Sequence, residues 1–289
     1  MKQDFKIHGL SKLGKFLHQF LEKPTEDYAQ DETELLALMK KSELENPWFT
    51  QENQRFCFKN WADVLKEENI KNWVSSYKIS HFSKKVGLIL AGNIPLVGFH
   101  DVICVILSNH IPIIKLSSKD KLILPFLLNK WGEFSEWNLE YQMVEKLTEY
   151  DAIIATGSNN TARYLEYYFK DSLSIIRKNR TSVAVIKGDE TDEELQLLAE
   201  DIFRYFGLGC RNVTRLFIPK DFEINNVEGK MVSLLPFPKV ENLVTDGLNW
   251  ELKNEDLEIT KRIGTRNFAT KSTVKISYSD GDLLVFIGQ

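Results

Sequence analysis

The sequence predicts an α/β protein built on a doubly wound parallel sheet, with a helical segment at its N-terminal end. Short apolar stretches alternate with helical ones from residue 84 onward, and this alternation is typical of a parallel sheet. Before residue 84, apolar residues recur at helical spacing instead. The chain has 289 residues and is 43% hydrophobic. That is enough for a sizeable core and for about two domains of roughly 100–200 residues each.

Residues 1–83 are predicted to be a helical segment that packs on the domain that follows. A first apolar set at residues 10–21 has helical spacing and ends before Pro24, and a second set follows at 35–39. Asn46-Pro47 interrupts the pattern, because the residue before a proline disfavours helix. We expect the large aromatic residues of this region to dock against another layer: Trp48, Phe49, Trp61 and Trp73.

Residues 84–181 are predicted to form the domain that contains the parallel sheet. The apolar stretches predict its strands, and the stretches between them predict its helices. Strands are expected at 86–91, 111–116 and 151–156, and helices at 98–107, 120–131 and 161–169. Ligands bind such a sheet at the carboxyl ends of its strands, so residues just after the strands are the candidates for a site.

Residues 182–289 are predicted to form a further domain. A strand at 182–186 is followed by a capping box, Thr191 with Glu194, which begins a helix that ends at Gly207-Leu208-Gly209. Another strand is expected at 213–218. Near the end of the chain, 272–278 and 283–287 predict two strands, and Asp280-Gly281 between them predicts a two-residue hairpin turn.

Charge and cysteine content exclude several classes of protein. The 37 Lys and Arg against 41 Asp and Glu give a net charge of -4, which argues against a nucleic-acid-binding protein. Three cysteines cannot form a disulfide framework and fit a reducing compartment, so a cytoplasmic location is expected. No apolar stretch reaches the ~20 residues of a membrane span, and no secretory signal is evident. The five histidines lack partners at ligand spacing, so no metal site is expected.

Two candidate sites follow the first two strands of the sheet. Gly92-Asn93 ends the first strand, where the glycine permits a sharp turn and the Asn93 amide can donate to a developing oxyanion. Asparagine between glycine and proline is also ordinary turn chemistry. Lys115 and Ser117 end the second strand, where a lysine suits a ribose or a phosphate. The alternative is a lysine whose stem packs at the strand end while its ammonium group reaches water.

Two further candidate sites lie later in the chain. Gly157-Ser158 joins the third strand to a helix, whose free N–H groups can bind an anion, although an ordinary turn explains the pattern as well. It is not a Gly-x-Gly-x-x-Gly fingerprint. Cys210 follows Gly207-Leu208-Gly209, and the adjacent Arg211 favours its thiolate form, the nucleophile. Cys210 can equally be structural, and Cys57 and Cys104 are expected to be buried core thiols.

The order of these four motifs resembles the aldehyde dehydrogenase superfamily, and more closely its acyl-CoA reductase branch, the LuxC-type fatty acyl reductases. The resemblance covers roughly residues 10–220 and is carried by residues 91–101, 115–120, 155–164 and 204–213. It implies an aldehyde-dehydrogenase-like fold in which 84–181 is the dinucleotide-binding domain. Residues 182–289 are then the α/β catalytic domain with the cysteine loop, shortened or divergent in its C-terminal part.

The resemblance also implies roles for single residues. Cys210 is the implied nucleophile, and the Asn93 side chain forms the oxyanion hole with the backbone N–H of Cys210. The cofactor-binding residues are implied to be Lys115 and Ser117, on the adenosine ribose, and Gly157 and Ser158, at the pyrophosphate. The implied cofactor is NADPH, with NADH as an alternative. A second glycine is common in the superfamily where Ala162 stands here.

The implied activity is reduction of a fatty acyl-CoA or acyl-protein thioester to the aldehyde, through a cysteine acyl-enzyme and a hydride from the nicotinamide. A homo-oligomer fits the resemblance, and the same residues would serve the reverse reaction. Residues 175–180 lack the carboxylate with which hydrolytic relatives activate water, and the basic residues there either meet phosphates or form a solvated loop: Arg177, Lys178 and Arg180. The family usually has a longer catalytic domain after the cysteine, and residues 225–289 do not match that region, so a catalytically impaired homologue that binds a nucleotide or a partner is the alternative function.

Overall fold

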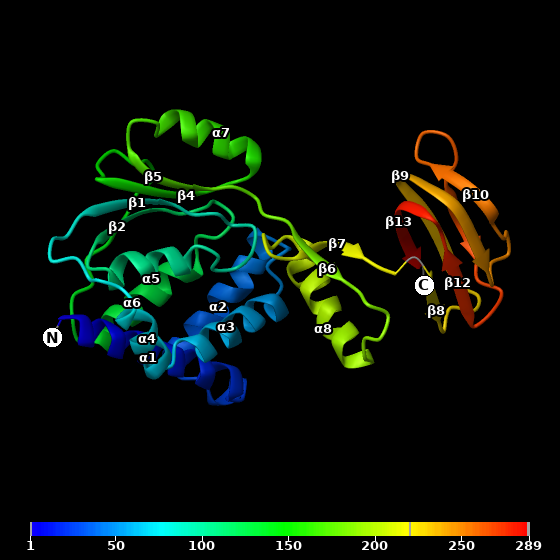
Figure 1. Ribbon diagram of the computed structural model, residues 1–289. Helices are drawn as coiled ribbons and strands as arrows, with labels where there is room; N and C mark the ends of the chain where they lie inside the picture. The colour runs from blue at the N-terminus through cyan, green and yellow to red at the C-terminus, as the bar shows by residue number, and fades with distance from the viewer. Residues whose placement is uncertain (1, 220, 288–289) are drawn as a thin grey trace. The chain divides into compact units, whose positions relative to one another are not determined.

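The computed structural model describes residues 2–219 and 221–287, which divide into two compact units (Figure 1). The first unit comprises Met1–Ser182 and Ala199–Asn212. The second comprises Val183–Leu198 and Val213–Gln289. Each unit has its own hydrophobic core, as expected for parts that fold around separate sets of buried side chains.

A five-stranded parallel sheet forms the centre of the first unit, in the order β3-β2-β1-β4-β5. The apolar stretches predicted as strands become its three central strands, and Lys85 to Ile89 pair with Ile111 to Lys115 in register. All five strands are parallel; successive strands are added on one side of β1 up to β3 and on its other side from β4 onward, which is the arrangement of a doubly wound sheet. The strands are β1 (Lys85–Ile89), β2 (Ile111–Lys115), β3 (Gln142–Met143), β4 (Ala152–Thr156) and β5 (Leu173–Arg177).

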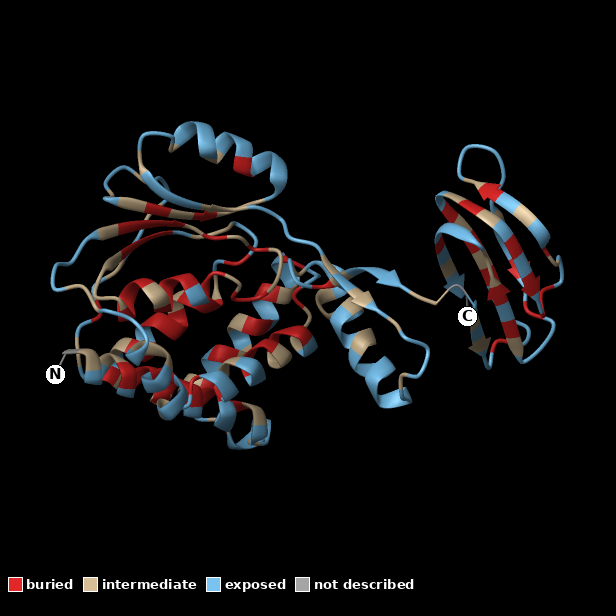
Figure 2. Ribbon diagram, in the orientation of Figure 1, coloured by how far each residue is buried: buried red, intermediate tan, exposed pale blue. Residues whose placement is uncertain are grey.

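Helices cover both faces of this sheet. In Figure 1, α5 (Phe99–Leu107) and α6 (Ile123–Ser135) lie on one face and α7 (Asn159–Tyr168) lies on the other. Figure 2 shows that α5 and α6 contain many buried residues, whereas Ala162 is the one buried residue of α7. The α/β class with a doubly wound parallel sheet is therefore confirmed.

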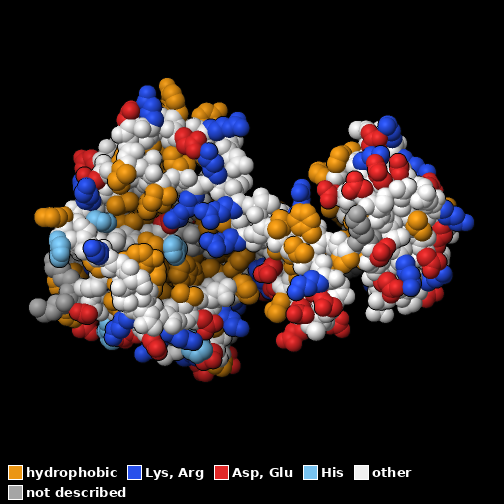
Figure 3. Space-filling model, in the orientation of Figure 1, with side chains coloured by type: hydrophobic (Ala, Val, Ile, Leu, Met, Phe, Trp, Pro, Cys, Tyr) orange, Lys and Arg blue, Asp and Glu red, His pale blue; other side chains and the backbone are white. Residues whose placement is uncertain are grey.

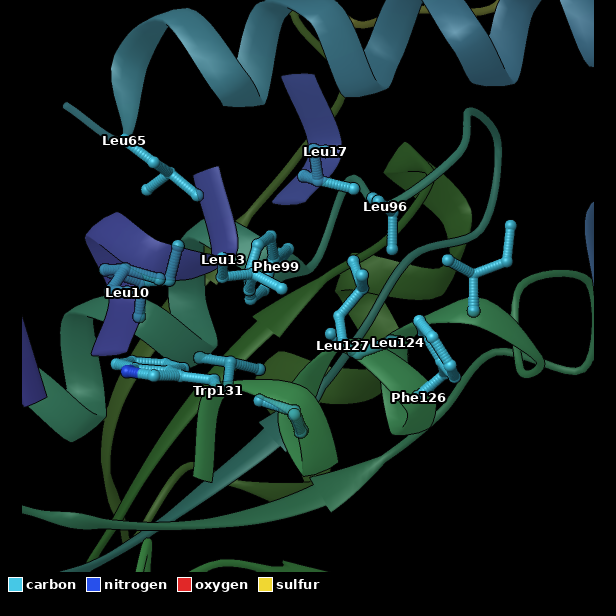
Figure 4. Close-up of a cluster of buried hydrophobic side chains, with 14 of the residues drawn as sticks. Leu10, Leu13, Leu17, Leu65, Leu96, Phe99, Leu124, Phe126, Leu127 and Trp131 are labelled. Carbon is cyan, nitrogen blue, oxygen red and sulfur yellow. The ribbon is translucent and has the colours of Figure 1, made fainter. Parts of the chain in front are cut away.

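The N-terminal helices pack against α6 and complete the core of the first unit. Three side chains of α1 (Lys2–Glu22) at helical spacing, Leu10, Leu13 and Leu17, are fully buried in the same cluster as Trp131 of α6, and Leu10 lies next to Trp131 (Figure 4). The indole N–H of Trp131 donates to the carbonyl of Lys6 at 2.9 Å, which satisfies the one polar group of that ring. The helical segment predicted from the sequence consists of α1 (Lys2–Glu22), the short 3-10 helix η1 (Thr25–Asp27), α2 (Gln30–Glu45), α3 (Gln51–Val64) and α4 (Glu67–Ser75).

The chain then passes from one unit to the other and back. The strands β6 (Ser182–Val185) and β7 (Val213–Phe217) form a two-stranded sheet. Between them, α8 (Asp192–Phe203) begins in the second unit and ends in the first, where η2 (Arg204–Gly207) follows. The predicted capping box is present at the start of α8, because Thr191 Oγ1 accepts from the Glu194 N–H and the Glu194 carboxylate accepts from the Thr191 N–H.

Residues 221–287 form a six-stranded, purely antiparallel sheet around the long strand β9. Its buried core consists of alternate residues, such as Val232 and Leu234. The sequence predicts that α/β structure continues over 182–289, but among the residues described beyond β7 there are strands and turns and no helix. The strands are β8 (Asp221–Asn225), β9 (Met231–Asp246), β10 (Lys253–Glu258), β11 (Gly264–Phe268), β12 (Thr273–Ser277) and β13 (Asp280–Ile287).

The predicted hairpin at Asp280-Gly281 is wrong, although both of its strands are present. β12 pairs with β8 and β9, and β13 pairs with β9. Gly281 lies against the backbone of β9 with φ +100, where a Cβ atom would overlap the carbonyl of Lys239. The glycine therefore permits a close approach between strands and does not form a two-residue turn.

Among the described residues, no helix is both long and apolar enough to span a membrane.

Candidate functional site

Three of the predicted motifs lie at the same edge of the parallel sheet. Asn93 follows β1, Lys115 ends β2 and Ser117 comes shortly after it, and Gly157-Ser158 follows β4. Because these strands are parallel, their carboxyl ends meet at one edge. The first two loops are in contact, since a Cβ atom at Gly92 would lie 2.7 Å from the Cβ of Ser117.

The cysteine motif lies against the loop that carries Asn93. The Asn93 Nδ2 donates to the carbonyl oxygen of Leu208 at 2.6 Å, two residues before Cys210. Asn93 is half-buried, whereas Cys210 is exposed. Within the described part of the chain, no group accepts a hydrogen bond from the backbone N–H of Cys210. An amide side chain, a backbone donor and an accessible thiol are thus positioned on neighbouring loops.

The backbone before Cys210 has an unusual conformation. Tyr205 and Phe206 both have φ +56, in the left-handed region that residues other than glycine rarely adopt, and Gly207 follows with φ +71. Asn212 holds the turn closed from the other side. Its Oδ1 accepts from the Gly209 N–H at 2.8 Å, and its Nδ2 donates to the Asp201 carbonyl at 2.8 Å. Asn212 is 8% exposed, so its side chain is an internal brace of the cysteine loop.

The edge near β2 and β4 has groups that fit a ligand with ribose and phosphate groups. Ser158 is the N-cap of α7 and accepts from the Thr161 N–H at 3.2 Å, which leaves the other first-turn N–H groups to face the edge of the sheet. Gly157 is needed there, because a Cβ atom would lie 2.9 Å from the Thr161 side chain. Lys115 is exposed at the end of β2, where its charge is available to an anion.

A buried carboxylate supports the loop that carries Asn93. Asp120 is 8% exposed, and its Oδ2 accepts from the Leu96 N–H at 2.8 Å. Leu96 has φ +55, so this hydrogen bond stabilises another left-handed residue. Burial raises the pKa of Asp120 to about 6, against the opposing effect of the Leu96 hydrogen bond.

A second ionisable cluster lies at the start of α5. Hydrogen bonds to Asp101 and Cys104 raise the pKa of His100 to about 9. Burial raises the pKa of Asp101, but hydrogen bonds from His100 and Arg177 outweigh it and the net shift is downward. Cys104 was expected to be a buried core thiol. It is only half-buried, because α5 turns this residue toward His100, with its Sγ 3.6 Å from His100 Nδ1. Cys57, in contrast, is buried as predicted.

The basic stretch at the end of β5 is largely paired with carboxylates. Arg177 forms an ion pair with Asp101, and Lys178 forms one with Glu166 at 2.7 Å. Arg180 is exposed. On the face shown in Figure 3, Lys and Arg side chains gather on the first unit beside hydrophobic ones. The pairing of Arg177 and Lys178 favours a structural role for those two residues over a phosphate-binding one.

Sequence reasoning assigned no role to three residues that shape the site. Asp120 and Asn212 lie inside the quoted motifs, but nothing in the pattern marked their side chains as internal hydrogen-bond partners. Cys57 was predicted only as a core thiol, yet its Sγ donates to the carbonyl of Pro95 at 3.3 Å. The signal available for Asp120 and Asn212 was their residue type, since Asp and Asn commonly bond to nearby backbone groups in turns.

Comparison with known protein families shows to which family the chain belongs. The acyl-CoA reductase (LuxC) family profile matches residues 17–235. The chain belongs to this family. A second profile, the vitamin B1 binding domain of thiamin pyrophosphokinase, matches residues 214–283 and so overlaps the antiparallel sheet. No match was found among curated proteins.

Solved structures of aldehyde dehydrogenases are similar in fold to this chain. Aldehyde dehydrogenase KauB from Pseudomonas aeruginosa is 13% identical, with a TM-score of 0.54 over 75% of this chain and 47% of its own. Aldehyde dehydrogenase 21 from Physcomitrella patens is 13% identical, with a TM-score of 0.53 over 74% and 50%. The NAD+ complex of an aldehyde dehydrogenase from Bacillus cereus is 16% identical, with a TM-score of 0.51 over 75% and 47%. The chain thus spans about half the length of these structures.

Proposed function

We propose that this chain accepts an acyl group from a thioester on Cys210, as the first half of an acyl-CoA reductase reaction. The observation that carries the proposal is the hydrogen bond from Asn93 to the carbonyl of Leu208, which joins the amide loop to the cysteine loop. Family membership supports the reaction class. The fatty acyl group, the CoA or protein carrier and the direction of the reaction are parts of this proposal.

The chemistry follows from the groups present. The Cys210 sulfur, as thiolate, attacks the carbonyl carbon of the thioester and forms a new C–S bond. The carbonyl oxygen becomes an oxyanion, for which the second N–H of the Asn93 amide and the backbone N–H of Cys210 are the available donors. The original C–S bond then breaks, and the CoA or carrier leaves as a thiolate that takes up a proton from solvent. The product is a Cys210 thioester.

Lys115, Ser117, Gly157 and Ser158 would hold a nicotinamide dinucleotide at the carboxyl edge of the sheet. Their chemistry fits the group, because the N-terminus of α7 offers backbone donors for a pyrophosphate and Lys115 offers a charge. A bound reduced nicotinamide would supply the hydride that releases the acyl group as an aldehyde. We propose NADPH for this site, with NADH as the alternative.

Mass spectrometry of the intact protein tests the nucleophile. The protein is mixed with a long-chain acyl-CoA without reductant, and the acylated residue is located by peptide mapping. We expect one acyl adduct on Cys210, loss of the adduct in Cys210→Ala, and its retention in Cys104→Ala, the matched control. A folded protein that gains no adduct would instead favour a homologue that binds a nucleotide or a partner without turnover.

The antiparallel sheet favours a second candidate function, binding of thiamin. The match of residues 214–283 to the vitamin B1 binding domain of thiamin pyrophosphokinase supports it. Isothermal titration of the full chain with thiamin tests the idea, with its free thiazole fragment as the control ligand. Saturable binding of thiamin but not of the fragment is expected, and the absence of heat for both would exclude this function.

A further inference from the structure

Two loops of the first unit carry the residues of the proposed acylation step, and both contact α3. We name residues 91–98 the asparagine loop, because they carry Asn93, and residues 204–210 the cysteine loop, because they carry Cys210. Neither loop is part of a strand of the parallel sheet. Their relative position therefore depends on side-chain contacts.

Cys57 of α3 touches both loops. Its thiol donates to the carbonyl of Pro95 in the asparagine loop at 3.3 Å. Burial, and after it the neighbouring Cys57 thiol, raise the pKa of the Tyr205 phenol in the cysteine loop. Cys57 is 6% exposed. Burial raises its pKa to about 12, with the charge of Asp120 as a further cause, so the thiol keeps its proton near neutral pH. It thus remains a donor and is a poor nucleophile.

Neighbouring side chains of α3 fix the cysteine loop on either side of this contact. The Arg204 guanidinium lies 4.3 Å from the ring centroid of Phe56, and its Nη1 donates to Glu52 at 2.8 Å. The ring of Tyr205 meets Phe56 edge-on at 5.9 Å. The side chains of α3 that contact the cysteine loop thus lie next to Cys57, which contacts the asparagine loop.

Both loops need such an anchor because both contain left-handed residues other than glycine. Leu96 in the asparagine loop has φ +55, and Tyr205 and Phe206 in the cysteine loop have φ +56. Residues persist in this region when surrounding contacts hold them there. Asp120 supplies that contact for Leu96, and the α3 contacts supply it for Tyr205.

We propose that Cys57 is a positioning residue for acylation: it holds the asparagine loop against the cysteine loop, so that Asn93 and Cys210 act on the same carbonyl. This inference rests on the proposed function of Cys210. Cys57 itself does not touch the reacting atoms, so it acts through the two loops.

Two reactions of Cys210 distinguish positioning from a general structural role. Acylation by acyl-CoA needs both Cys210 and Asn93, whereas alkylation by iodoacetamide needs the thiolate alone. Cys57→Ala is expected to slow acylation about 10- to 100-fold, since small misplacements of catalytic groups have effects of that order. Alkylation of Cys210, followed by peptide mapping, should stay within about twofold of wild type, because thiolate reactivity follows local charge and exposure.

Conservative variants show whether the polar contacts of Cys57 with Pro95 and Tyr205 matter. Cys57→Ser keeps a donor and is expected to recover most of the acylation rate. Tyr205→Phe removes only the phenol hydroxyl and is expected to slow acylation less than Cys57→Ala does. Cys104→Ala is the control for loss of a thiol elsewhere and should behave as wild type. Equal effects on acylation and alkylation, or no effect on acylation, would overturn the inference.

Hydrogen exchange tests the same inference without chemistry. In Cys57→Ala, amide exchange should accelerate in both loops together, in peptides that cover 91–98 and 204–210. An exchange rate equal to that of wild type in either loop would contradict the inference that Cys57 holds the two loops together. If wild-type protein gains no acyl adduct, the proposed function fails, and the exchange experiment still decides whether Cys57 joins the loops. If Cys57→Ala does not fold, Cys57→Ser and Tyr205→Phe provide the comparison.

Discussion

The buried carboxylate of Asp120 should make the stability of the first unit depend on pH. Asp120 is 8% exposed and accepts one hydrogen bond, from the Leu96 N–H. Burial raises its pKa from the ordinary 3.8 to about 6. The folded state therefore binds this proton more tightly than the unfolded state does, and the ionised carboxylate lowers stability above pH 6. The prediction is that Asp120→Asn removes this dependence.

The size of the effect follows from the two pKa values. Each pH unit between 3.8 and about 6 corresponds to ~1.4 kcal/mol, so the ionised Asp120 lowers the free energy of unfolding by ~3 kcal/mol at high pH. This penalty decreases as the pH falls through 6 and is gone below 3.8. By the linkage relation, the penalty at pH 4.5 is ~2 kcal/mol smaller than the penalty at pH 8. The free-energy difference between Asp120→Asn and wild type should therefore be ~2 kcal/mol more favourable to the variant at pH 8 than at pH 4.5.

Urea unfolding followed by tryptophan fluorescence measures this difference. Five of the six tryptophans lie in the first unit, so the signal reports mainly on it. Any constant effect of the new amide cancels in the comparison of the two pH values. Asp63→Asn, at an exposed residue of α3, is the matched control for the replacement of an aspartate by an asparagine. Parallel stability curves for wild type and Asp120→Asn would refute the reasoning.

Three other predictions concern the same unit. The nuclear magnetic resonance signal of His100 should titrate with a midpoint near 9 and move toward 6.5 in Asp101→Asn, and the stability that His100 contributes should be lost as the pH rises through 9; an unchanged midpoint would contradict the pairing. Asn212→Ala should lower the free energy of unfolding in urea by ~1–3 kcal/mol, because the Gly209 N–H and the Asp201 carbonyl lose their partner. Gly92→Ala should abolish acylation and Ser117→Gly in the same chain should restore it, since the new methyl group meets the Ser117 side chain; failure of the rescue would contradict the clash with Ser117 as the cause.

The sequence predicts the architecture of the first unit well, because its signals are local. The strands β1, β2 and β4 are short apolar stretches, and each is followed by a turn and a helix with regular spacing. Parallel pairing follows from that alternation, and it brings Asn93, Lys115 and Ser158 to one edge. Cys210 follows no strand of this sheet, so the family resemblance, and not the spacing of the strands, predicts that it lies close to Asn93.

The antiparallel sheet could not be derived in the same way. Its central strand β9 pairs with β10, β11, β12 and β13, so its contacts depend on partners that no local pattern specifies. Asp280-Gly281 has the composition of a hairpin turn, yet β13 pairs with β9. Cys57 shows the same limit within the first unit. Its apolar surroundings predict burial, but the two loops that its thiol joins are 38 and 148 residues further along the chain.

The two family matches overlap over residues 214–235, and the first of them ends inside a strand that cannot be divided. The acyl-CoA reductase match ends at residue 235, within β9 (Met231–Asp246), and the match to the vitamin B1 binding domain covers 214–283. Four of the strands that pair with β9 begin after residue 235, and the buried core of this sheet draws on residues from both sides of that position. A strand without partners leaves its backbone groups unpaired, so a cut at 235 would expose half of β9 and open the core. A boundary between the reductase-like part and the antiparallel sheet must therefore precede β8, where no strand of that sheet is severed.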